Sequence, residues 1–189
     1  QTVQAVIEER LSRLTPQTHQ LAQLAATIGR GFTVEELAVA SGFGEDMLVM
    51  GLDELWRHRI VREQGERYDF SHDKIREVAY RQASVPRRRS LHQHVGSALA
   101  LIYAGREDEV AGELAVHAEQ VGHIGHAIEY LERAARVEQS VGAYADAVVR
   151  LRRALHLIPS LPLPAEDVLQ RELALLTLLG TCLLALRGY

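Results

Sequence analysis

The chain has 189 residues, of which 47% are apolar, enough to bury one sizeable core or two small ones. Its formal net charge of −4 excludes bulk electrostatic attraction to nucleic acid or to an anionic membrane. Cys182 is the only cysteine, which excludes an internal disulfide and a cysteine-paired zinc site and makes a reducing, cytoplasmic setting the natural expectation.

The first 60 residues carry the start and stop signals of four helices. Apolar residues at helical spacing mark the first helix, at Val3, Ile7, Leu11 and Leu14. Thr15 and Pro16 open a second helix that Gly29 ends, and Thr33 to Glu36 form a capping box for a third that ends at Gly42. A fourth is expected from about Glu45 to Arg59, with Trp56 packed in the core or at a hinge.

The hydrophobic pattern then changes. Residues 60–63 and 67–70 flank a turn at Gln64-Gly65-Glu66, which predicts a short β-hairpin, and Ser71 is expected to cap the helix that follows. Helices followed by a small hairpin and another helix describe a winged helix-turn-helix, here over residues 1–85. Plain helices with a polar loop at Gln64 are the alternative.

After Pro86 the sequence predicts helices over residues 87–103, 110–121, 126–141, 143–158 and 166–186, and a non-helical linker over 159–164. Counting back from Pro159, the small, bulky and small positions of a tetratricopeptide helix fall on Ala147, Leu151 and Ala154. The same spacing occurs a second time upstream, at Ala127, Leu131 and Ala134. The two copies are about 20 residues apart instead of 34. We therefore expect a mainly α protein in which a degenerate tetratricopeptide-like array over residues 86–189 follows the winged helix.

The last helix fits the first helix of a further repeat, through Leu176, Leu179, Gly180 and Leu183. A repeat helix without a neighbour leaves its apolar face uncovered, so the sequence predicts truncation and self-association through this helix. Folding back onto its own array is the alternative. The uncharged run from Leu173 to Leu186 is shorter than the roughly 20 residues that a bilayer requires, so no membrane partner is expected.

Catalytic chemistry is not expected in this chain. Lys74 is the only lysine and has no glycine-rich turn before it, which excludes a P-loop. The sequence also shows no pattern of a nucleophile, a general base and a residue that orients the base. His123 and His126, with His117, have the spacing of a weak metal site but lack companion ligands. The cluster Arg87 to Arg89 either contacts phosphate or an acidic neighbour, or lies in a solvated turn.

Four segments carry a family resemblance: residues 25–32, 68–80, 88–92 and 114–117. They resemble the region after the nucleotide-binding domain in STAND proteins (signal-transducing ATPases with numerous domains), among them large bacterial transcriptional activators and cyclase-linked predicted ATPases. The resemblance implies a switch that ADP holds closed and that ATP and an inducer open. It implies an upstream nucleotide-binding domain as a partner, a protein or small-molecule inducer on the helical arm, ATP or ADP as cofactor of the parent protein only, and packing roles for His92 and His117.

The resemblance also gives His72 a role. In related switch ATPases a Met-His-Asp motif opens the last winged-helix helix, and its histidine reaches the ADP β-phosphate; Phe70-Ser71-His72-Asp73 matches that place, with serine instead of methionine. Local capping or packing of His72 is the alternative. DNA binding by the winged helix is a rival function, which Glu45, Asp46, Asp53 and Glu54 in the fourth helix disfavour.

Overall fold

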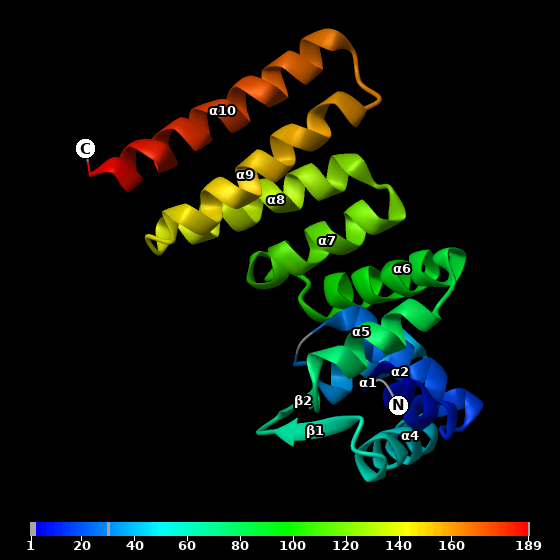
Figure 1. Cartoon of the computed structure of the whole chain (residues 1–189). Coiled ribbons are helices and arrows are strands. Elements are labelled where there is room, and N and C mark those ends of the chain that lie inside the picture. The colour runs from blue at the N-terminus through cyan, green and yellow to red at the C-terminus, as the bar shows by residue number, and fades with distance from the viewer. Residues whose placement is uncertain (1–2, 30, 189) are drawn as a thin grey trace. The chain divides into compact units, whose positions relative to one another are not determined.

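The computed structural model describes residues 3–29 and 31–188, and it is mainly helical, as predicted. Within these residues it contains ten α-helices, two short 3-10 helices and one two-stranded antiparallel sheet (Figure 1). The chain divides into two compact units, residues 1–98 and residues 99–189, and each is described by itself.

The first unit contains α1 (Val3–Ser12), α2 (Pro16–Ile28), α3 (Val34–Ser41), α4 (Glu45–Arg57), β1 (Val61–Gln64), β2 (Arg67–Phe70), α5 (Asp73–Gln82) and most of α6 (Val85–Ile102). Local chemistry sets several of these ends. The Thr15 side chain accepts from the Thr18 amide at the start of α2, and Thr33 and Glu36 form the predicted reciprocal capping box of α3. Helix α2 packs against α3, α4 and α5, so it forms the centre of the unit's core.

The predicted hairpin is confirmed. Val61 pairs with Phe70 and Gln64 with Arg67 across the two strands, and Phe32 adds a bridge on the other side through reciprocal hydrogen bonds with Tyr68 of 2.8 and 2.7 Å. The predicted Ser71 cap is wrong, because the Ser71 amide still donates to the Ile60 carbonyl at 2.9 Å and the N-cap of α5 is His72.

The second unit contains η1 (Glu107–Val110), α7 (Ala111–Val121), α8 (Ile124–Ser140), α9 (Tyr144–Leu157), η2 (Ile158–Ser160) and α10 (Ala165–Arg187). Each of the four α-helices packs against the next one along the chain, and Figure 1 shows them side by side in that order. Glycine at the left-handed position of Gly122 (φ 84°) permits the sharp turn from α7 to α8.

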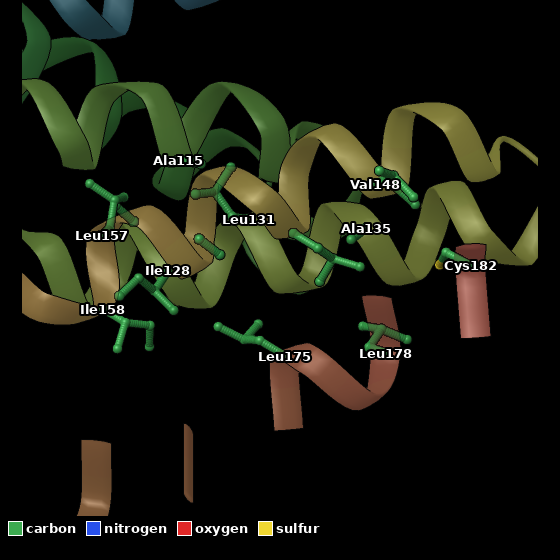
Figure 2. Packing of buried hydrophobic residues seen from close by; sticks show 14 of the residues in the cluster. Ala115, Ile128, Leu131, Ala135, Val148, Leu157, Ile158, Leu175, Leu178 and Cys182 are labelled. Carbon is green, nitrogen blue, oxygen red and sulfur yellow. The ribbon is translucent and has the colours of Figure 1, made fainter. Parts of the chain in front are cut away.

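One cluster of buried apolar residues, contributed by α7 to α10, forms the core of the second unit (Figure 2). Leu175, Leu178 and Cys182 of α10 belong to it. The predicted non-helical linker at 159–164 is wrong at its start, because Pro159 and Ser160 lie in η2. A proline is tolerated there because the first turn of a helix does not use its amide hydrogen.

Candidate functional site

A basic cavity of about 960 Å³ lies in the first unit. The end of α1, the segment from the end of α4 into β1, and the residues before α5 line it. The lining residues are Arg10, Arg13, Trp56, Arg57, His58, Arg59, Val61, Arg62, Ser71 and His72. Five of these residues are arginines and two are histidines, and among the described lining residues none is acidic. Guanidinium groups bind carboxylate and phosphate through paired hydrogen bonds, so the lining favours an anion.

Arg10 fixes one wall of this cavity. Its Nη2 atom donates to the carbonyl oxygens of His58 and Arg59, both at 2.7 Å. These carbonyls lie at the end of α4, where helix carbonyls lack partners within the helix and a cation is favoured. Arg10 therefore stabilises the end of α4 and brings a positive charge to the cavity.

Arg59 adopts a backbone conformation that normally belongs to glycine. Its φ is 53°, and it is the one non-glycine with positive φ among the described residues. The Ile60 amide donates to the Leu55 carbonyl at 2.9 Å and the Arg59 amide to the Trp56 carbonyl at 2.8 Å, which is the Schellman arrangement at a helix end. The left-handed residue of that arrangement is usually glycine, whereas here it is an arginine that lines the cavity.

His72 lies at the cavity as an exposed residue. Its carbonyl begins α5 by accepting from the Ile75 amide at 2.9 Å, but its side chain makes no capping hydrogen bond. The imidazole is thus not used to cap the helix locally. The cavity brings His72 together with five arginines that no sequence motif linked to it.

Two carboxylates outside the lining pair with cavity arginines. Arg13 contacts Glu9 at 2.6 Å and Arg62 contacts Asp69 at 3.6 Å; both arginines and Glu9 are exposed, whereas Asp69 is mostly buried. Exposed ion pairs of this kind are weak and are screened by salt, so both guanidinium groups can be recruited by a stronger anion.

Trp56 also lines the cavity, and of the two predicted roles, packing in the core or at a hinge, packing in the core is wrong. The residue is 59% exposed, and it is the only tryptophan of the chain. The helical pattern of α4 reserves the buried face for Leu48, Leu52 and Leu55, which leaves the indole on the outside. An exposed aromatic face beside guanidinium groups can stack on a planar ligand.

The six predicted repeat residues all lie in the second unit and all are buried. Ala127, Ala147 and Ala154 are 0% exposed. Leu131 and Leu151 share their cluster, whereas Ala134 is buried outside it. Small side chains at these positions let α8 and α9 pack closely.

His92 and His117 are buried, 5% and 3% exposed. Burial, with a further contribution from the nearby Arg88 guanidinium, lowers the pKa of His92, whose Nε2 lies 2.8 Å from the Tyr80 hydroxyl. The rings of His123 and His126 meet edge to face at 5.9 Å. No group of three or more potential metal ligands occurs in the part of the chain that the structure describes.

The second unit has its own groove of about 570 Å³, between the start of α8 and the start of α10. Glu129, Asp167 and Arg171 are among its lining residues, together with Ile128, Leu161 and Leu163. Its mixed charge and apolar side chains differ from the uniformly basic cavity of the first unit. Helix α10, which borders the groove, is long and apolar enough by length and composition alone to cross a membrane, a property that core helices of soluble proteins share.

Comparison of the chain with models of protein families, with curated proteins and with solved structures finds no match.

Proposed function

We propose that this chain is a non-catalytic regulatory and protein-interaction segment of a multidomain signalling ATPase or transcriptional regulator. The first unit acts as a winged helix that contacts the phosphates of a nucleotide held by a neighbouring nucleotide-binding domain. The second unit acts as a tetratricopeptide-like arm for a protein or small-molecule inducer. The cytoplasm is the setting of this proposal.

The observation that carries the proposal is the convergence of His72 and five arginines on one cavity. The STAND resemblance gives His72 contact with the ADP β-phosphate, and a pyrophosphate group needs several cationic donors around it. Arg59 and Arg62 supply such donors from the end of α4 and from β1, independently of the resemblance.

Two features support the architecture in this proposal. The hairpin directly after α4, with Phe32 paired on the far side of β2, is the arrangement of strands expected for a wing. Successive packing of α7 to α10 around buried alanines is the arrangement expected for repeat helices.

Titration of the chain with ADP and with inorganic pyrophosphate tests the proposal. Trp56 lines the cavity and is the only tryptophan, so its fluorescence reports occupancy directly. We expect a saturable change for both ligands that weakens as salt rises, because charge drives the contact. No change in the Trp56 signal up to about millimolar ligand, which corresponds to roughly −4 kcal/mol of binding free energy, would refute phosphate recognition at this site.

Three variants sharpen the experiment. His72→Ala and Arg62→Ala should each weaken pyrophosphate binding by roughly 10-fold, the effect of losing one charge-assisted hydrogen bond of about 1.5 kcal/mol. Arg152→Ala removes the same charge as Arg62→Ala, at an exposed position on α9, and should leave binding unchanged. Equal weakening by all three variants would mean that net charge, and not the cavity, attracts the anion.

DNA binding by the winged helix is a second candidate, and the five arginines that line the cavity favour it. Glu54, one of the acidic residues of α4 that disfavour it, accepts hydrogen bonds from the Thr15 amide and from the hydroxyls of Thr15 and Thr18 and keeps its negative charge. A gel shift with random duplex across a salt series separates the candidates. Log-linear binding with a slope steeper than about −3, equivalent to three or more neutralised phosphates, supports DNA binding. Binding of pyrophosphate without measurable duplex binding supports the nucleotide role.

A further inference from the structure

Helix α10 has two apolar faces, and only one of them packs within the chain. Leu175, Leu178 and Cys182 are buried in the core cluster, on the side of α10 that faces α8 and α9 (Figure 2). On the opposite side an outer stripe of leucines remains exposed: Leu169 at 64%, Leu173 at 66%, Leu176 at 47% and Leu184 at 56%. These positions recur at the spacing of one helix face, and they extend over about 22 Å at 1.5 Å per residue.

Gly180 lies within the outer stripe, one turn after Leu176 and one turn before Leu184. A Cβ added to Gly180 would meet no atom within 4 Å, so no close contact inside the chain requires glycine here. Glycine also weakens a helix interior relative to alanine. A gap flanked by exposed leucines is instead suited to the approach of a large side chain from outside.

We propose that the outer stripe is an interface with a second copy of this chain, in which two α10 helices pack antiparallel. The symmetry axis passes between Leu176 and Thr177. This register sets Leu169 opposite Leu184 of the second copy, and Leu173 opposite the gap at Gly180 of the second copy. The two-fold operation repeats both contacts, as a closed dimer requires.

Charge selects the antiparallel direction. Glu166 and Asp167 lie in the first turn of α10 and Arg187 in its last turn. The same register sets Glu166 opposite Arg187 of the second copy at both ends of the interface. A parallel pair would instead bring the acidic ends of the two helices together, where like charges repel.

The proposal goes beyond the regulatory function above and does not depend on it. A membrane-spanning position is a poorer explanation of the exposed stripe, because the opposite face of α10 is already packed on protein and Arg171 of the same helix pairs with Glu132 of α8 at 3.6 Å. A membrane-spanning helix would have to give up both interactions.

Sedimentation equilibrium of the full chain tests the proposal. We expect a monomer–dimer equilibrium with a dissociation constant in the micromolar range, because a single helix pair covers less area than a standard interface of about 800 Å² per partner. Leu173→Glu should weaken dimerisation at least 100-fold. Val149→Glu is the matched control, because Val149 is 65% exposed on α9 and lies off the stripe, and it should leave the dimer unchanged. A strictly monomeric chain at several hundred micromolar, or equal effects of the two variants, would overturn the proposal.

Two further experiments test the register without relying on a destabilising variant. Gly180→Leu fills the gap, so it should weaken the dimer at least 10-fold while leaving the single chain folded, since open space surrounds Gly180. Glu166→Arg and Arg187→Glu should each weaken dimerisation by roughly 2- to 20-fold, as expected for two exposed ion pairs, and the double variant should restore it. A double variant that stays as weak as the singles would overturn the antiparallel register.

Flotation with phosphatidylcholine vesicles distinguishes the lipid alternative. The chain should remain with the soluble fraction at concentrations where it dimerises. Flotation that Leu173→Glu abolishes would show that lipid, and not a second copy, covers the outer stripe, and would overturn the proposal.

Discussion

Replacing Ala147 by leucine should destabilise the second unit strongly, because the packing of α8 on α9 depends on small side chains. Ala147 is 0% exposed, so the three added carbon atoms must displace neighbouring side chains of the core cluster. Overpacking of this kind costs about 1–3 kcal/mol. For a compact unit of roughly 90 residues, each kcal/mol lowers the melting temperature by about 4–8 °C, which gives an expected fall on the order of 5–20 °C.

Ala145→Leu is the matched control, since Ala145 lies on the same helix but is exposed. The same chemical change there should alter stability by less than about 0.5 kcal/mol. Thermal and urea unfolding followed by far-UV circular dichroism measure both variants, and the Trp56 fluorescence separately follows the unit that contains residues 1–98. If the melting temperature of Ala147→Leu equals or exceeds that of Ala145→Leu, α8 and α9 do not pack closely at this point and the repeat interpretation fails.

Three further predictions concern single side chains of the two units. Burial and Arg88 lower the pKa of His92, so on acidification this histidine takes up a proton in the unfolded chain before it does so in the folded one, and stability should fall as pH drops below about 6.5. In urea unfolding His92→Gln should flatten that pH dependence, whereas His94→Gln, at an exposed histidine, should not. Burial alone would raise the pKa of Glu54, but hydrogen bonds from Thr18 and Thr15 outweigh it and lower the pKa. The contribution of Glu54 is therefore present above about pH 4.5 and is lost as pH falls through the lowered pKa, and at pH 7 Glu54→Gln should cost about 1–2 kcal/mol in urea unfolding. Cys182 is buried, so its thiol should react with a disulfide reagent only in denaturant, and rapid reaction of the native chain would contradict the packing of α10.

Helix ends were predictable because their chemistry is local. The Thr15 cap, the Thr33–Glu36 capping box and the left-handed Gly42 use residues within a few positions of each other, and each occurs where the sequence indicates it. The N-cap of α5 depends on a distant partner instead. The Ser71 amide donates to the carbonyl of Ile60, which lies just before β1, so the helix begins one residue later than its serine suggests.

The candidate site was much less predictable, because its residues come from separate segments. His72 was identified through a motif resemblance, whereas Arg10 and Arg62 lie 62 and 10 positions before it and share no motif with it. They meet because α1 binds the end of α4 through Arg10. A positional signal was available for part of the lining, because Arg57, His58, Arg59 and Arg62 lie together in the sequence, but nothing in the sequence connects that run to Arg10 or His72.

Because Arg59 has a positive φ, this turn is less stable than the same turn would be with glycine at that position. Glycine at such a position is favoured by about 1 kcal/mol, so Arg59→Gly should strengthen the fold in urea unfolding while it deprives the cavity of one guanidinium. This single substitution would then raise the free energy of unfolding and lower the affinity of the cavity for an anion. Such a variant separates what this turn contributes to folding from what its side chain contributes to recognition.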